Sequence, residues 1–134
     1  MLKQYGKKES GDNLFKSATQ LALSISNQFM FVTDYDAGNL QALTKDGNII
    51  WKFSDLELKQ PWGVCVLSGQ YILVCGRGSN NVLQVDKKGK RIRELLGPSE
   101  KLNDPLALAF DRETSRLLIG NSSNEIHVYT LSKM

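Results

Sequence analysis

The strongest constraint on the fold of this chain is an internal repeat. Three pairs of like residues recur at nearly the same spacing: Pro61 and Pro105 are 44 residues apart, Asn81 and Asn124 are 43 apart, and Val32 and Val74 are 42 apart. Three copies of a unit of about 43 residues therefore fill the chain. A period of ~40–45 residues with four strands per unit is typical of β-propeller blades. We therefore predict an all-β fold built of propeller blades.

Within each unit, short segments are wholly apolar or alternate between apolar and polar residues, which is the pattern of β-strands. Strand a is predicted at 21–24, 63–67 and 106–110, strand b at 29–33, 71–75 and 117–120, strand c at 40–44, 82–86 and 125–129, and strand d at 48–53 and 90–95. The segments KDG and KKG, which end at Gly47 and Gly89, predict hairpin turns between strands c and d, because glycine adopts a positive φ without strain.

The third unit ends after its strand c, and the N-terminus offers a strand d to complete it. Propellers avoid an unpaired edge by pairing strands from opposite ends of the chain. We therefore expect one domain over residues 1–134 with four parts. Residues 1–6 give the closing strand d, about 17–58 give blade one, 59–103 give blade two, and 104–134 give blade three.

The segments PWGVCV, FVTDYDAGN and NNVLQVDKKG resemble the NHL repeat. The pattern of that family runs Pro-x-Gly-Val, a hydrophobic strand, Val-x-Asp, a short loop, Asn, an Ile-x-Val-like strand and a Gly turn. The first unit departs from it with ATQLALS, and the third has Ala107 in place of the glycine. Units two and three carry Gly76 and Gly120 where the family often has aspartate.

The family is best known from the C-terminal half of TRIM-NHL proteins, and the resemblance implies a six-bladed propeller. Three units are half of such a ring and would leave two apolar blade faces open, since a repeat cannot bury its hydrophobic face alone. We expect either a homodimer in which two copies close the ring around a twofold axis, or a half excised from a longer natural chain. With two cysteines and one histidine, the chain lacks the zinc-binding RING and B-box domains of TRIM proteins.

The composition indicates the cellular compartment and the kinds of partner to expect. No apolar run reaches the length of a membrane span, and the N-terminal segment MLKQYGKKESGD has no hydrophobic signal-peptide core. We therefore expect a cytoplasmic or nuclear protein without a membrane partner. Cys65 and Cys75 lie in separate strand patterns and are expected to be buried, reduced thiols. A net charge of +3 is compatible with nucleic-acid binding without requiring it.

Catalytic patterns are missing from the sequence. The single histidine, His127, falls within a predicted strand and cannot build a nucleophile triad without placed partners. The run DYDAGN from Asp34 is the nearest to a calcium loop but ends without the glutamate that such loops need, and Asp34 aligns with no carboxylate in units two and three. The run GRGSNN precedes a strand, whereas a phosphate loop precedes a helix. We expect no metal, no cofactor and no enzymatic activity.

The predicted ligand surface is the end of the blades where the d-to-a and b-to-c connections emerge, here called the loop face. Aromatic rings there can stack on a base or a peptide side chain, and a guanidinium can pair with a phosphate or carboxylate. For Trp62 the alternative interpretation is that its ring packs in the wall of the propeller channel. The candidate binding residues are Lys16, Tyr35, Lys59, Gln60, Trp62, Arg77, Asn80 and Lys101.

A second basic cluster follows the c-to-d turn of unit two. It consists of Lys87, Lys88, Lys90, Arg91 and Arg93. Alternating charge on an outer strand usually guards a sheet edge, and contact with nucleic acid is the alternative role. The cluster is expected on the face opposite to the loop face or on the rim. The candidate residues of the loop face favour protein or peptide recognition. The resemblance to the NHL family implies that the chain is the substrate-binding part of a TRIM-like ubiquitin ligase. Single-stranded RNA binding, which some NHL propellers perform, is the alternative, and a propeller enzyme is a distant third.

Overall fold

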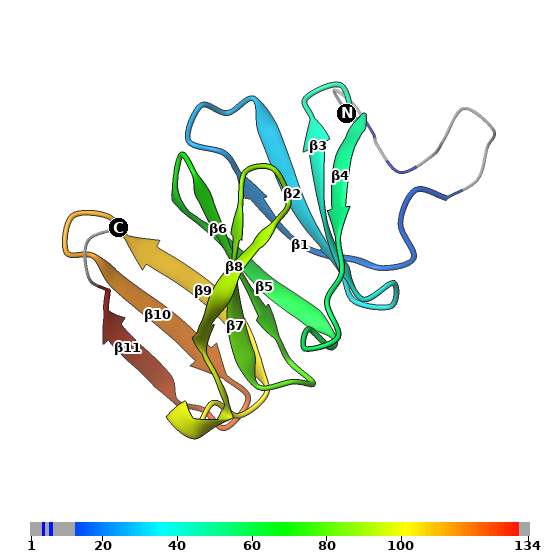
Figure 1. The fold of residues 1–134 in the computed structure, drawn as a ribbon. Helices are drawn as coiled ribbons and strands as arrows, with labels where there is room; N and C mark the ends of the chain where they lie inside the picture. The colour runs from blue at the N-terminus through cyan, green and yellow to red at the C-terminus, as the bar shows by residue number, and fades with distance from the viewer. Residues whose placement is uncertain (1–3, 5, 7–12, 132–134) are drawn as a thin grey trace.

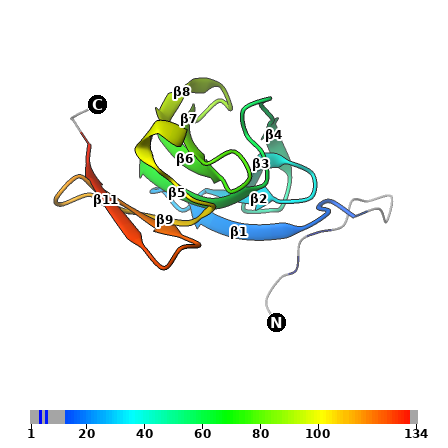
Figure 2. The same ribbon diagram turned by 90° about the horizontal axis from the view of Figure 1, so that it is seen from below.

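The computed structural model describes residues 4, 6 and 13–131 of the chain. Within them, the strands form three antiparallel sheets that stand side by side in sequence order (Figures 1 and 2). Each sheet is one repeat unit, as the 43-residue spacing predicted. The predicted all-β fold of propeller blades is confirmed.

The strands follow the predicted order within each blade. Blade one contains β1 (Ala18–Leu23), β2 (Phe29–Asp34), β3 (Asn39–Thr44) and β4 (Ile49–Phe53). Blade two contains β5 (Pro61–Ser68), β6 (Tyr71–Gly76), β7 (Asn81–Asp86) and β8 (Arg91–Leu96), followed by the 3-10 turn η1 (Pro98–Glu100). Blade three contains β9 (Pro105–Asp111), β10 (Arg116–Asn121) and β11 (Ile126–Thr130). Strand β1 begins earlier than the predicted Leu21, because its register with β2 extends back to Ala18.

Two hydrophobic clusters join the blades. The cluster between blades one and two includes Phe31 and Leu40 from blade one and Ile72, Val74 and Leu83 from blade two. The cluster between blades two and three is built from the residues that point the other way out of blade two, together with two strand b residues of blade three: Cys65, Leu73, Cys75, Val82, Leu117 and Ile119. Blade two is therefore covered on both faces, since successive side chains along a strand point to opposite sides of the sheet.

The predicted c-to-d turns are confirmed. Gly47 and Gly89 adopt φ values of +85° and +84°. In each turn the glycine N–H donates to the carbonyl of the residue that ends strand c, Thr44 or Asp86. At Gly89 a side chain would also collide with its surroundings, because a Cβ there would lie 2.7 Å from Cδ2 of Trp51.

The end of strand b carries a polar clasp in each blade, and here one prediction from the sequence is wrong. Strand pairing sets Asp34 opposite Ala18, Gly76 opposite Pro61 and Asn121 opposite Pro105. The counterpart of Asp34 in unit three is therefore Asn121, not Gly120. The segment from Pro105 to Asn121 is one residue longer than the segment from Pro61 to Gly76, so an alignment that sets Pro105 on Pro61 reaches Gly120 instead.

The clasp joins the b-to-c loop to the d-to-a connection. The carboxylate of Asp34 accepts hydrogen bonds from the backbone N–H groups of Lys16, Ser17 and Ala37. In blade three, the Asn121 side-chain oxygen accepts one from the N–H of Asn103.

Blade two uses a serine instead. The hydroxyl of Ser79 accepts a hydrogen bond from the N–H of Lys59 and donates one to Asn81 Oδ1. A side chain at Gly76 would overlap that hydroxyl. The glycine and the serine therefore replace the acidic clasp of blade one together.

Blade three differs from the other two in its number of described strands, and like blade one it leaves one apolar face exposed. In the described residues its sheet has three strands, in the order β11-β10-β9. Ile126 and Val128 on β11 are 70% and 54% exposed. At the other end of the molecule, Leu21 and Leu23 of β1 are also exposed. The predicted closing strand at residues 1–6 lies outside the described residues, apart from Gln4 and Gly6.

Candidate functional site

Backbone hydrogen bonds bring the predicted connections together at the loop face, which is the lower edge of the molecule in Figure 1. In blade two the N–H groups of Arg77 and Gly78 donate to the carbonyls of Gln60 and Lys59. In blade one the N–H of Tyr35 donates to the carbonyl of Ser17, and in blade three Ser122 bonds Asn103 in the same way. The d-to-a and b-to-c loops are thus held in contact in all three blades.

Three of the eight candidate residues form a continuous row on this face. The rings of Tyr35 and Trp62 meet edge to face, with centroids 5.1 Å apart and planes at 85°. The Arg77 guanidinium lies 5.3 Å from the centroid of the Trp62 ring, which is within the range of cation–π attraction. All three side chains are half-buried. The row crosses from blade one, which supplies Tyr35, to blade two.

The Trp62 side chain contacts both the packing between blades and two other candidate residues. Its ring packs against the cluster between blades two and three, and it also contacts Tyr35 and Arg77. Its backbone is fixed as well, because the Thr33 hydroxyl donates to the Trp62 carbonyl at 2.7 Å. Trp62 is therefore a rigid, partly exposed aromatic surface.

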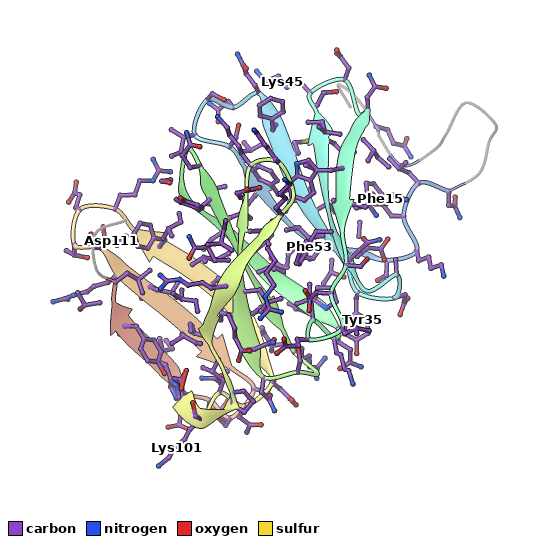
Figure 3. The ribbon with its side chains drawn as sticks, viewed as in Figure 1. Phe15, Tyr35, Lys45, Phe53, Lys101 and Asp111 are labelled. Atoms are coloured by element: carbon purple, nitrogen blue, oxygen red, sulfur yellow. The ribbon has the colours of Figure 1, made fainter. Side chains whose placement is uncertain are left out.

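The remaining candidates divide into two groups. Gln60 and Asn80 hold the loops: both have positive φ, and Asn80 Oδ1 accepts a hydrogen bond from the N–H of Asp104. Lys16, Lys59 and Lys101 are exposed cations. Tyr35 and Lys101 mark opposite ends of the loop face in Figure 3.

The described residues contain no group of three or more His, Cys, Asp or Glu side chains that could hold a metal ion. The Asp34 carboxylate is buried among backbone N–H donors, so its role in this structure is to clasp loops. The ring of His127 lies 6.3 Å from that of Tyr129, within blade three. Among the same described residues, no helix is long and apolar enough to cross a membrane.

Cys65 and Cys75 are free, buried thiols. Burial raises the pKa of both to about 12. The Cys75 sulfur accepts a hydrogen bond from the N–H of Gly63 and donates one to the carbonyl of Pro105. Because the thiolate is the reactive form, neither thiol is suited to act as a nucleophile near neutral pH. Cys75 instead links blade two to blade three.

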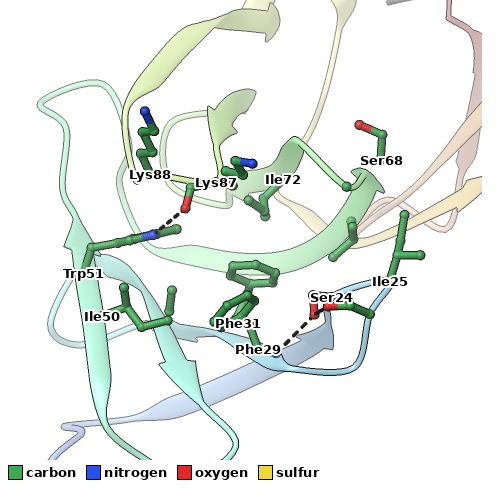
Figure 4. Close-up of a pocket in the computed structure, with 14 residues that line it drawn as sticks. Ser24, Ile25, Phe29, Phe31, Ile50, Trp51, Ser68, Ile72, Lys87 and Lys88 are labelled. Carbon is green, nitrogen blue, oxygen red and sulfur yellow. Dashed lines mark hydrogen bonds between the residues drawn. The ribbon is translucent and has the colours of Figure 1, made fainter.

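The structure also shows a cleft that the sequence did not predict. It lies between blades one and two on the face opposite to the loop face and has a volume of about 580 Å³ (Figure 4). Its apolar lining includes Ile25, Phe29, Phe31, Ile50, Trp51 and Ile72. The signal in the sequence was weak. Ile25 lies in an a-to-b loop, Phe29 begins strand b and Ile50 lies on the outer strand d, and each resembles an ordinary exposed residue until the blades are placed side by side.

The residues of the second basic cluster, which lies beside this cleft, have different roles. Lys87 and Lys88 line it. Arg91 instead forms ion pairs with Asp55 and Glu57, at 3.1 and 2.9 Å, and Arg93 donates to the Gln84 side chain. The two arginines thus bind neighbouring side chains of the fold, while the two lysines belong to the cleft.

Comparisons with known proteins identify the fold. No protein-family model matches the chain, and no curated protein does either. Similar solved structures include Kuenenia stuttgartiensis hydrazine synthase, with a TM-score of 0.73 and 16% identity over 92% of this chain and 34% of that one. A chain of a nidogen/laminin complex gives a TM-score of 0.73 and 18% identity over 87% of this chain and 45% of that one.

Virginiamycin B lyase from Staphylococcus aureus gives a TM-score of 0.62 and 14% identity over 96% of this chain and 48% of that one. The chain thus spans less than half the length of each of these three. At such identities the likeness concerns the fold alone, and the NHL assignment stays a prediction from the repeat motifs. The chain has the fold of β-propeller blades.

Proposed function

We propose that this protein is a non-catalytic recognition module that binds a protein or peptide ligand on its loop face. The observation that carries the proposal is the row of Tyr35, Trp62 and Arg77, in which a cation lies over an indole ring that a second aromatic ring contacts from the side. These three residue types are the ones most enriched among the residues that dominate protein-binding energy.

The chemistry around the row favours a peptide that carries a carboxylate. A guanidinium can form two parallel hydrogen bonds to a carboxylate. The exposed Lys16, Lys59 and Lys101 add positive charge to the same face, which speeds encounter with an acidic partner. Within a longer protein of the TRIM type, such a face would select the substrate of a ubiquitin ligase.

The test is selection from a random peptide pool, followed by affinity measurement for the selected peptides. Trp62→Ala and Arg77→Ala should each weaken binding by about tenfold or more, the effect of removing a central anchor. Because the Trp62 ring also packs against the cluster between blades two and three, its loss should lower the melting temperature as well, whereas the loss of half-buried Arg77 should shift it by a few degrees at most. Arg112→Ala serves as the matched control, since Arg112 is an exposed arginine in the a-to-b connection of blade three.

The proposal fails if no peptide is selected, or if selected peptides bind the Trp62→Ala variant as well as the wild type. A single-stranded RNA pool provides the competing outcome. RNA binding would weaken steeply with salt, and removing Arg77 or Lys101 would each reduce the slope of log affinity against log salt by about one. Such behaviour, without peptide selection, would replace the peptide proposal with RNA recognition.

A further inference from the structure

We propose that the cleft between blades one and two is a second binding site, which takes a small molecule with an apolar, ring-sized body and one anionic group. The site lies on the face opposite to the loop face and shares no residue with the row of Tyr35, Trp62 and Arg77. Its existence is therefore independent of the proposed peptide recognition. Its volume of about 580 Å³ lies within the ~300–1,000 Å³ range of small-molecule sites.

The floor of the cleft is apolar and already formed. Phe31 and Ile72 are buried members of the cluster that joins blades one and two. Phe29, Ile50 and Ile25 surround the mouth and remain 39%, 47% and 44% exposed. Large apolar side chains that converge on one hollow, rather than lying scattered on the surface, indicate a binding surface.

Trp51 forms a rigid wall of the site. Its indole N–H donates to the carbonyl of Lys87 at 3.0 Å, so the ring of blade one is fixed to the turn of blade two (Figure 4). The Phe31 ring lies at 6.0 Å on one side, and Gly89 packs against the indole face with no room for a Cβ. Because Trp51 is already fixed, a ligand that contacts it would bind with little entropic cost for ordering the protein.

The rim of the cleft gives the site its charge preference. Among the described residues that line it, the charged ones are Lys87 and Lys88, and the other polar side chains are serines. Figure 4 shows both lysines at the same side of the hollow, on the turn to which Trp51 is bonded. An anionic group placed beside these ammonium groups would be stabilised while the rest of the ligand covers the apolar floor.

Two dyes test the charge and the apolar requirement separately. The probes are 8-anilinonaphthalene-1-sulfonate and N-phenyl-1-naphthylamine, which share their rings and differ in the sulfonate. Dye fluorescence, which is excited directly and rises when the dye leaves water for an apolar site, reports binding. We expect saturable, one-to-one binding of both dyes, with the sulfonate bound more tightly.

Two substitutions then locate the dye. Lys87→Gln keeps the carbonyl that binds Trp51 and should weaken the sulfonate by about two- to fivefold, the range for an exposed ion pair, while leaving the neutral dye unchanged. Gly69→Trp should block both dyes by about tenfold or more, because a Cβ at Gly69 meets open space at the rim. Lys90→Gln is the matched charge control, since Lys90 is an exposed lysine of the same turn that does not line the cleft.

The inference is overturned if binding does not saturate, if Gly69→Trp leaves it intact, or if Lys87→Gln and Lys90→Gln affect the sulfonate equally. Because these dyes also adhere to open apolar sheet faces, Val128→Ser on the exposed face of blade three is measured alongside. A loss of dye with Val128→Ser, and none with Gly69→Trp, would assign the binding to that face and reject the cleft.

Discussion

Blades two and three carry the same repeat but differ in how they are buried. In β7 of blade two, the residues from Asn81 to Val85 are all buried, whereas β11 of blade three alternates between exposed and half-buried positions. The same contrast separates β5 from β9. Local sequence therefore determines that a strand forms, and the neighbouring blades determine whether both of its faces are covered.

The sequence of β11 in blade three is nevertheless typical of a strand whose two faces are both buried. His127 and Tyr129 alternate along β11 with Ile126 and Val128, and the latter pair is exposed on the side away from blade two. Leu21 and Leu23 repeat this on blade one. Exposed apolar rows on both end blades would bury one another if the blades of two chains met.

The largest predicted effect concerns assembly, which would remove the difference in burial between blades two and three. We propose that a second copy covers the outer face of blade three with the outer face of its own blade one, and that two such junctions close a ring. In sedimentation velocity at micromolar concentration, the wild type should therefore have twice the mass of the 15.0 kDa chain.

Val128→Lys should convert that dimer to a monomer, because it would bury an unpaired ammonium at the junction. Ile92→Lys, on the outer strand β8, is the control and should leave the mass unchanged, since Ile92 is also exposed but belongs to the middle blade. A wild-type chain that sediments as a stable monomer would reject the second copy as the covering partner.

The next effect concerns the core. Leu73 of blade two is fully buried, whereas Leu118, its counterpart in blade three, is half-buried. Leu73→Ala should lower the free energy of unfolding by about 3–4 kcal/mol and Leu118→Ala by about 1–2 kcal/mol, because the cost follows the contacts that are lost. Chemical denaturation at low protein concentration measures both.

The same pair also tests the assembly. If a second copy covers blade three, the destabilisation by Leu118→Ala should grow with protein concentration. Leu73→Ala should then be more destabilising than Leu118→Ala only at concentrations where the chain is monomeric. Equal effects at concentrations where the chain is monomeric would contradict the burial difference between the two blades.

Much of the fold could be predicted because it depends on local patterns. Alternating apolar residues indicated the strands, and Gly47 and Gly89 indicated the turns between strands c and d. The counterpart of Asp34 in blade three could not be predicted, because the extra residue between Pro105 and Asn121 is located only by the strand pairing. An alignment by sequence placed Gly120 there instead.

The candidate site was predictable only in part. The order of strands placed Tyr35, Trp62 and Arg77 on one face, but the contact between their rings depends on how blade one packs against blade two. The cleft escaped prediction for the same reason. Phe29 and Trp51 come from blade one and Lys87 from blade two, and no periodicity within a strand reports the space between two sheets.

The smallest predicted effect is the difference in stability between variants of the clasps at the end of strand b. The Asp34 carboxylate accepts three backbone hydrogen bonds, and the Asn121 side chain accepts one. Asp34→Ala should therefore cost about 2–3 kcal/mol, the range for hydrogen bonds to a charged group, and Asn121→Ala about 1 kcal/mol.

The experiment is thermal and chemical unfolding of both variants, with amide hydrogen exchange to locate the loss. In Asp34→Ala, the N–H groups of Lys16, Ser17 and Ala37 should exchange faster, because each loses its acceptor. In Asn121→Ala, faster exchange should be confined to the N–H of Asn103. Asp36→Ala is the control, since Asp36 is exposed in the same loop as Ala37. If Asp34→Ala were no more destabilising than Asp36→Ala, the carboxylate would not be holding the loops, and a role for Asp34 in ligand binding would have to be considered in its place.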